Sequence, residues 1–127
     1  MENLVKDFLK QKRFAVVGSF RNESKYAYRI LKALMKKGYE VYPVNPRLKE
    51  VEGRVCYASV KDIPVVVDVV DIVTPSEVTE RIVKECKEIG IKRVWLQPGA
   101  ENEKAIEFCK QNKIRVIYNL CVMIEAI

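Results

Sequence analysis

The fold is decided by residues 14–44, which read FAVVGSFRNESKYAYRILKALMKKGYEVYPV. The stretch begins with four apolar residues, a pattern typical of a buried strand that ends at Gly18. Apolar residues then recur at helical spacing until Gly38, a residue that commonly follows a helix. A second apolar run occupies 41–44, although Pro43 is awkward inside a central strand because it lacks an N–H donor. The stretch therefore predicts a strand, a helix and a second strand.

The same alternation of short apolar runs and helical patterns continues to the end of the chain. Strands that alternate with helices make right-handed crossovers, which give a parallel sheet covered on both faces. We therefore predict an α/β fold, namely a Rossmann-like, doubly wound, five-stranded parallel sheet in three layers with strand order 3-2-1-4-5. The predicted strands are 14–17, 41–44, 69–73, 93–96 and 115–118. The predicted helices are 2–11, 27–35, one that ends at Gly90, 101–111 and 120–126, and 45–64 is predicted to be irregular.

Length and composition favour one domain in the cytoplasm. A chain of 127 residues fits a single core, so we expect residues 1–127 to form one domain with a helix in 1–12 packed on it. No apolar run approaches the roughly 20 residues that span a bilayer, and the first residues lack the apolar core of a signal peptide. The four cysteines are far apart in the sequence, which argues against a disulfide framework and against a zinc site.

The sequence contains no histidine. Histidine is the usual proton shuttle near neutral pH and the commonest metal ligand, so its absence argues against most hydrolases, phosphohistidine enzymes and metalloenzymes. The net charge of +6, from 23 basic and 17 acidic residues, suits an anionic partner. Because the basic residues are scattered and often stand beside glutamate, we favour a solvated surface over a nucleic-acid-binding face.

The predicted fold also locates the site. Ligands of an open parallel sheet bind beyond the carboxyl ends of the strands, where the strand order reverses. The site should therefore be built from the loops that follow the five predicted strands. These loops are 18–25, 45–49, 74–78, 97–99 and 119–121.

The first of these loops favours a phosphate site. It reads GSFRNESKY over residues 18–26 and has one glycine where the dinucleotide-binding fingerprint has three, which weakens an NAD(P) interpretation. Two hydroxyls and two cations instead surround the predicted start of a helix, where free backbone N–H groups attract anions. The alternative is that Ser24 is only an N-cap and that the cations are solvated. The candidate residues here are Gly18, Ser19, Phe20, Arg21, Ser24, Lys25 and Tyr26.

The loop after the second strand lacks the acidic residue that usually accepts the ribose hydroxyls of NAD. It carries Asn45, Pro46 and Arg47, with Lys49 close by. Basic residues at this point suit a phosphorylated ribose, which both NADP and coenzyme A possess. The alternative is that Asn45 and Pro46 are only a turn signal.

The three remaining loops offer weaker evidence. Thr74-Pro75-Ser76-Glu77 has the form of a capping box, whose free donors would also face the site. Gln97, before Pro98 and Gly99, could offer its amide to a ligand, whereas Trp95 is expected in the core. Cys86 and Cys109 fit apolar helix faces. Cys121 follows the last strand, where a thiol could meet a ligand thiol, although a structural role is the simpler interpretation.

Five motifs carry a family resemblance, namely GSF…SKYAY, GYEVYPVNP…VEG, DIVTPSEV, VWLQPGAENE and YNLCVMIE. Together they closely resemble the stand-alone CoA-binding domain family, which is related to the N-terminal domain of the succinyl-CoA synthetase α subunit. The match runs from about Phe14 to Glu125, and its motifs fall in order at the five loops. The resemblance implies a CoA-binding variant of the Rossmann fold with coenzyme A as the cofactor.

The resemblance also implies roles for single residues. Gly18, Ser19, Ser24, Lys25 and Tyr26 would hold the pyrophosphate, and Asn45 and Pro46 would border the adenosine with its 3′-phosphate. Thr74, Pro75 and Val78 would line the path of the adenine and pantetheine, and Gln97, Gly99 and Cys121 would lie toward the thiol. The complete predicted set adds Phe20, Arg21, Arg47 and Ser76. The synthetases act through a phosphorylated histidine, which this sequence lacks, so we expect binding without ligase activity.

The leading hypothesis is a non-catalytic module that binds coenzyme A or acyl-CoA, as a sensor, a carrier or a separate subunit of a ligase. The alternative is an NADP-dependent reductase, which the basic residues after the second strand favour and the missing glycines oppose. A third hypothesis, a basic nucleic-acid-binding domain, rests on charge alone. Small domains with an exposed sheet edge often pair, so a homodimer is a further expectation.

Overall fold

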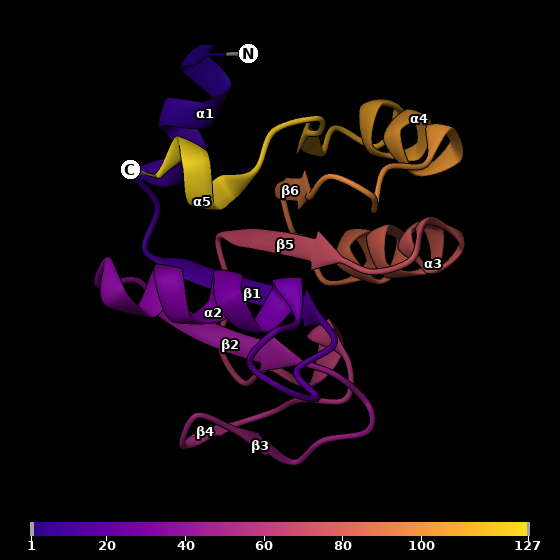
Figure 1. Ribbon diagram of the computed structural model, residues 1–127. Coiled ribbons are helices and arrows are strands. Elements are labelled where there is room, and N and C mark those ends of the chain that lie inside the picture. The colour runs from indigo at the N-terminus through magenta and orange to yellow at the C-terminus, as the bar shows by residue number, and fades with distance from the viewer. Residues whose placement is uncertain (1, 127) are drawn as a thin grey trace.

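A five-stranded parallel sheet forms the middle layer of the computed structural model, which describes residues 2–126 (Figure 1). Every pair of neighbouring strands in this sheet is parallel. In their order across the sheet, the strands are β2 (Glu40–Val44), β1 (Arg13–Gly18), β5 (Val69–Val73), β6 (Arg93–Leu96) and β7 (Arg115–Ile117). The five predicted strands are therefore confirmed to within about one residue at either end.

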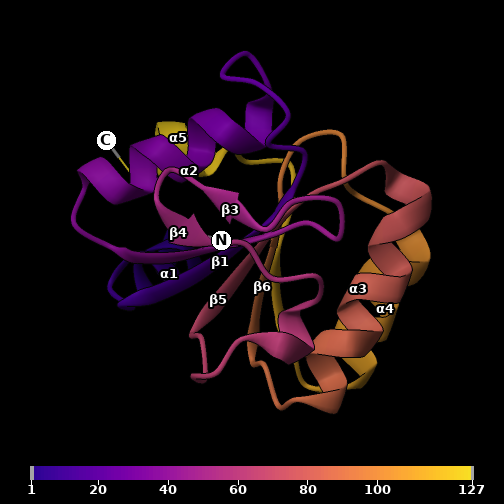
Figure 2. The same cartoon turned by 90° about the horizontal axis from the view of Figure 1, so that it is seen from below.

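Helices cover both faces of this sheet, as the doubly wound prediction requires (Figure 2). One face is covered by α1 (Glu2–Leu9), α2 (Tyr26–Lys36) and α5 (Val122–Glu125), and the other by α3 (Ser76–Glu88) and α4 (Glu103–Gln111). The Rossmann-like α/β fold in three layers is thereby confirmed. No helix within residues 2–126 has the length and apolar character needed to cross a membrane.

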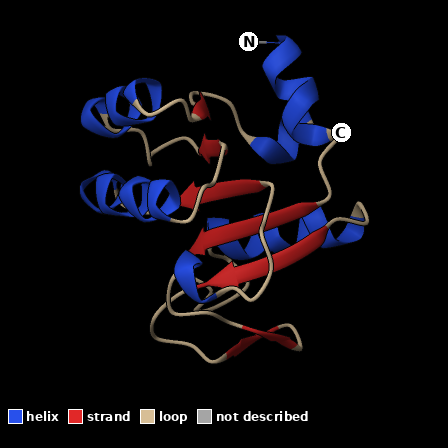
Figure 3. Cartoon of the chain, turned by 180° about the vertical axis from the view of Figure 1, so that it is seen from behind, coloured by secondary structure: helices blue, strands red, loops and turns tan. Residues whose placement is uncertain are grey.

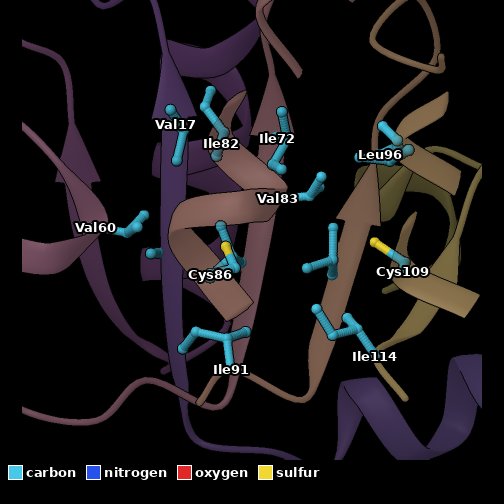
Figure 4. Packing of buried hydrophobic residues seen from close by; sticks show 14 of the residues in the cluster. Val17, Val60, Ile72, Ile82, Val83, Cys86, Ile91, Leu96, Cys109 and Ile114 are labelled. Atoms are coloured by element: carbon cyan, nitrogen blue, oxygen red, sulfur yellow. The ribbon is translucent and has the colours of Figure 1, made fainter. Parts of the chain in front are cut away.

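The core lies in two halves, one on each face of the sheet. On the face of α3 and α4, Ile72 and Leu96 of the strands share a cluster with Val83, Cys86 and Cys109 of the helices (Figure 4). Both of these cysteines are completely buried, which confirms their predicted place in the core.

The opposite half of the core centres on Trp95, which is completely buried as predicted. Its ring meets the ring of Phe8 in α1 edge to face, with 6.0 Å between the ring centroids. The indole N–H donates to the carbonyl of Leu120, at 2.8 Å. A carboxylate of α1, Asp7, contacts Arg93 at 2.9 Å, and this contact lowers the pKa of Asp7. These contacts fix α1 and the segment before α5 to the same face of the sheet.

The predicted strand order, 3-2-1-4-5, is wrong at one place. The third strand in that numbering is β5, which pairs with β1 and not with β2. The predicted order would place β2 between two partners, where each of its N–H groups would be needed. Pro43 of β2 has no N–H, and the structure accordingly places β2 at the edge of the sheet. The strand order reverses between β1 and β5, which become the centre of the carboxyl edge.

The segment between β2 and β5 is only partly irregular. It contains a two-stranded antiparallel hairpin of β3 (Glu50–Val51) and β4 (Arg54–Val55), and a 3-10 helix η1 (Val60–Asp62). Figure 3 shows the hairpin outside the main sheet. The turn of the hairpin has positive φ angles at Glu52 and Gly53. The side chain of Glu52 contacts Lys32 of α2 at 2.9 Å and the hydroxyl of Tyr28, so the hairpin is attached to α2.

Two predicted helix starts need correction. Pro75 is the N-cap of α3, and the Thr74 hydroxyl contacts the Thr79 hydroxyl at 3.0 Å, so the predicted capping box does not form. Lys25, and not Ser24, precedes α2 as its N-cap, because Ser24 is engaged with Asn22. In both places the serine or threonine hydroxyl finds a side-chain partner in place of the free N–H groups of the helix.

Candidate functional site

A groove of about 660 Å³ lies at the carboxyl edge of the sheet, where the strand order reverses between β1 and β5. Three loops and the first turns of α3 enclose it. We call it the edge groove. Its lining consists of Val17, Gly18, Ser19, Phe20, Arg21, Lys25, Val44, Asn45, Pro46, Arg47, Leu48, Val73, Thr74, Pro75, Arg81 and Ile82.

Gly18 at the end of β1 lets α2 pack against the sheet at this edge. A Cβ atom at this position would lie 2.6 Å from the Cβ of Ala27 and 2.8 Å from the carbonyl oxygen of Val73. Only glycine allows this close approach of α2 to β1 and β5. The close packing holds the start of α2, with its free N–H donors, at the groove.

The loop between β1 and α2 presents cations to the edge groove. Asn22 shapes this loop, because its side-chain oxygen accepts from the backbone N–H of Ser24 at 3.0 Å and also from the Ser24 hydroxyl. Arg21 and Lys25 line the groove, whereas the Ser24 side chain does not. The phosphate interpretation of this loop therefore rests on its cations, on Ser19 and on the backbone donors.

Asn45 ties the loop after β2 to the loop after β1. Its side-chain nitrogen donates to the carbonyl oxygen of Gly18 at 2.6 Å, and its side-chain oxygen accepts from the N–H of Arg47 at 2.8 Å. One side chain thus fixes the separation between two walls of the edge groove. The amide of Asn45 is a positioning group for the site.

We predict that Asn45→Ala weakens binding of any ligand in the edge groove about tenfold, because the variant loses the hydrogen bond to Gly18 that joins the two walls and the bond to Arg47 that shapes the loop after β2. Isothermal titration calorimetry with the ligand proposed below measures this change. Asn112→Ala is the matched control, since the Asn112 side chain donates to the carbonyl of Phe108, away from the groove. Equal affinities for the two variants would contradict the positioning role of Asn45.

The third wall contains two residues that sequence reasoning missed, Arg81 and Ile82 of α3. The prediction considered only the start of this helix, at Thr74, Pro75, Ser76 and Val78, and of these Thr74 and Pro75 line the groove. Positions 81 and 82 lie three and four residues after the predicted Val78, and so on the same side of the helix, but Val78 itself does not line the groove. The other unpredicted residues are the apolar Val17, Val44, Leu48 and Val73, which form part of the lining.

The predicted residues after β6 do not join the edge groove. Gln97 is completely buried, and its side-chain nitrogen donates to the Asp71 carboxyl at 2.9 Å. Its side-chain oxygen accepts from the N–H of Val122 at 3.0 Å, so both the nitrogen and the oxygen of the amide form hydrogen bonds inside the protein. Gly99 forms a turn with φ +97°. The predicted residues outside the groove lining are Ser24, Tyr26, Ser76, Val78, Gln97, Gly99 and Cys121.

Tyr26 and Cys121 meet beside the edge groove, which the sequence did not indicate. The Tyr26 hydroxyl donates to the sulfur of Cys121, joining the first residue of α2 to the residue before α5. Burial raises the pKa of Tyr26, and the contact with Cys121 raises it further. Beneath them Asp71 is completely buried, and burial raises the pKa of this carboxyl to about 8. The pair therefore consists of a neutral phenol and a half-buried thiol over a buried acid.

Another hollow, of about 780 Å³, lies along α3 and α4, and its described lining shares no residue with that of the edge groove. Its lining includes Glu80, Glu103 and Glu107 together with Lys84 and Lys104. The acidic residues there disfavour an anionic ligand. Within residues 2–126, no group of three or more cysteine or acidic side chains is arranged to hold a metal ion. The edge groove is thus the better candidate site for an anionic ligand.

Comparison with known proteins identifies the family to which this site belongs. A family model described as CoA binding domain matches residues 12–127. The chain belongs to the CoA-binding domain family. The resemblance that the five motifs indicated is thereby confirmed, and every loop of the edge groove lies within the matched residues.

Two curated relatives show how the family is used. The chain is 32% identical to an uncharacterized protein of Bacillus subtilis, YneT, over 94% of this chain and 90% of that protein. It is also 34% identical to the α subunit of ADP-forming acetate–CoA ligase II from Pyrococcus furiosus. That alignment covers 91% of this chain but 28% of the ligase subunit. The family therefore includes both small proteins and parts of larger ligases.

Among solved structures, a conserved hypothetical protein from Pyrococcus furiosus is similar in both fold and size. It superposes with a TM-score of 0.86 and 42% sequence identity, covering 90% of this chain and 98% of the other. This likeness confirms the single small α/β architecture.

Proposed function

We propose that the chain binds coenzyme A, or an acyl-CoA, in the edge groove. The observation that carries this proposal is the charge of the groove. Its lining contains four basic residues, Arg21, Lys25, Arg47 and Arg81, and no acidic residue among those that the structure describes. Coenzyme A carries a pyrophosphate and a 3′-phosphate, so its adenosine end needs several cations at once. Membership of the CoA-binding domain family supports the same ligand.

The walls of the groove suit the different parts of this ligand. The N-terminus of α2, with Arg21 and Lys25 nearby, supplies N–H donors and positive charge for the pyrophosphate. Apolar side chains, among them Val17, Leu48 and Ile82, offer surface for the adenine. A volume of about 660 Å³ lies within the range typical of small-molecule sites. We expect the pantetheine to leave the groove toward Cys121.

The role that we propose is binding without catalysis, as a carrier, a sensor or a separate subunit that works with a ligase. Among residues 2–126, the Tyr26 hydroxyl and the Cys121 sulfur hydrogen-bond to each other alone, and the nearby Asp71 carboxyl is engaged with Gln97, so neither has a partner that would make it a base or a nucleophile. We place the role in the cytoplasm, because all four cysteines are free thiols. The named ligase activity of the Pyrococcus furiosus relative belongs to a much longer subunit.

An NADP-dependent reductase is the second candidate, since Arg47 after β2 would also suit the 2′-phosphate of NADP. The loop between β1 and α2 argues against it. After Gly18 this loop has no further glycine to let a dinucleotide pyrophosphate approach the backbone closely.

Isothermal titration calorimetry with coenzyme A and with NADPH tests the proposal. We expect a dissociation constant for coenzyme A in the micromolar range or below, and no measurable heat with NADPH. Reversal of two groove charges in the variant Lys25→Glu/Arg47→Glu should weaken coenzyme A binding by about 100-fold or more. The control, Lys104→Glu, changes a cation of the other hollow and should bind as the wild type does. Tight binding of NADPH without binding of coenzyme A would refute the proposal.

A further inference from the structure

Arg81 is the cation of the edge groove that comes from α3. Its side chain is 66% exposed and lies 3.3 Å from the carboxylate of Glu85, one helical turn further on. The Glu85 side chain is only 20% exposed, and the hydroxyl of Ser59 donates to its other oxygen at 3.2 Å. Arg81 is thus paired with a carboxylate that a second contact holds in place, at the wall of a groove whose described lining contains no acidic residue.

The other groove cations come from different walls. Arg21 and Lys25 belong to the loop between β1 and α2, and Arg47 follows β2. Helices α2 and α3 lie on opposite faces of the sheet, so the donors at the start of α2 and the Arg81 side chain approach the groove from opposite faces. Cations that approach from opposite faces suit a ligand that carries phosphate groups at two separate places.

Coenzyme A carries its phosphates in this way. The pyrophosphate is joined to the 5′ oxygen of the ribose, and the monophosphate is joined to its 3′ oxygen. If the α2 N-terminus holds the pyrophosphate, the remaining cations are free for the monophosphate. A phosphate dianion also suits a guanidinium, whose planar fork can donate two parallel hydrogen bonds.

We propose that Arg81 is a specificity-determining residue that binds the ribose 3′-phosphate of coenzyme A together with Arg47. On binding, the Arg81 guanidinium exchanges the Glu85 carboxylate for the phosphate. The exchange costs little, because an ion pair between residues four apart in one helix is weak when one partner, here Arg81, is mostly exposed. Glu85 keeps its contact with Ser59, so its charge is not left without a partner. This inference rests on the proposed function, since it concerns one phosphate of the proposed ligand.

The test compares two ligands and two variants by isothermal titration calorimetry. The ligands are coenzyme A and 3′-dephospho-coenzyme A, which differ only in the 3′-phosphate. Arg81→Gln should weaken coenzyme A binding about tenfold but change dephospho-coenzyme A binding by less than about twofold. Lys84→Gln is the matched control, because Lys84 also forms an ion pair within α3, with Glu80 at 3.4 Å, but does not line the edge groove. Its affinity for both ligands should equal that of the wild type.

Two further variants sharpen the test. Glu85→Gln removes the charge that competes for Arg81 and should strengthen coenzyme A binding about two- to threefold, without an effect on the dephospho ligand. Arg81→Lys keeps the positive charge but loses the planar guanidinium that can donate two parallel hydrogen bonds. Its affinity for coenzyme A should therefore lie between those of Arg81→Gln and the wild type. Circular dichroism of each variant checks that the fold is retained.

Either of two results would overturn the inference about Arg81. One is a loss in Arg81→Gln that is equal for both ligands, and the other is no loss for either. The wild-type titration distinguishes these results from failure of the proposed function. If the wild type binds neither ligand, the proposed function itself is wrong and the role of Arg81 fails with it.

Discussion

Replacement of Gly18 by alanine is expected to lower the free energy of unfolding by about 3 kcal/mol, because the added methyl group has no space. Its Cβ would lie 2.6 Å from the Cβ of Ala27 and 2.8 Å from the carbonyl oxygen of Val73. The neighbours are a short side chain and a backbone atom, so neither can turn away. The helix α2 must move outward, and its N-terminus then leaves the edge groove. We therefore also expect loss of coenzyme A binding. Urea denaturation and calorimetry measure the two effects.

The control for this variant is Gly38→Ala. Gly38 has a φ of +93°, and a Cβ atom there would meet no heavy atom of residues 2–126 within 4 Å. Alanine at this position must adopt a left-handed backbone conformation, which should lower the free energy of unfolding by about 1 kcal/mol. The Gly38→Ala variant should bind coenzyme A as the wild type does. If both variants lost the same stability and both still bound the ligand, the close packing of α2 on β1 would not matter for the site.

The second large effect concerns Asp71, whose carboxyl is completely buried and accepts one hydrogen bond, from Gln97. Its second oxygen has no partner among the residues that the structure describes. Burial raises the pKa of this carboxyl from 3.8 to about 8. At pH values between these two pKa values, Asp71 is protonated in the folded protein but ionised in the unfolded chain. The free energy of unfolding should therefore fall as the pH rises through this window.

Asp71→Asn removes this titration, because an amide keeps the acceptor for Gln97 but cannot ionise. The stability of the variant relative to the wild type should increase between pH 4 and pH 8 by as much as about 5 kcal/mol. Urea denaturation of both proteins at several pH values measures the difference. Asp62→Asn makes the same substitution at an exposed aspartate and serves as the control. A constant difference for Asp71→Asn would show that Asp71 does not stay protonated in the fold.

Most of the fold could be predicted because each buried strand is a short apolar run and each helix has one apolar face. The order of the strands could not be predicted from these local patterns, since pairing depends on contacts between distant segments. Pro43 was nevertheless an informative residue. Its missing N–H made it unsuited to a central strand, and the structure places β2 at the edge. The hairpin of β3 and β4 escaped prediction because each of its strands has only two residues.

The sequence predicted correctly those site residues whose position depends only on which strand they follow. The loops after β1, β2 and β5 meet because the carboxyl ends of neighbouring parallel strands lie at the same edge of the sheet. The amide of Gln97 faces the interior because Asp71 lies one strand away and Val122 offers its N–H, and no pattern in the sequence reveals such a network. The place of Arg81 in the groove was not predicted, because a basic residue in the second turn of a helix is typical of an ordinary solvated surface.

The most direct test of the central claim is to follow the backbone amide resonances of isotope-labelled protein while coenzyme A is added. We predict that the amides of Ser19, Arg47 and Thr74 shift together and saturate at one dissociation constant. The amides of Glu107 and Gln111, in the hollow along α3 and α4, should not move. A titration to millimolar coenzyme A that leaves the first three amides unchanged, or that shifts the second group in their place, would contradict binding in the edge groove.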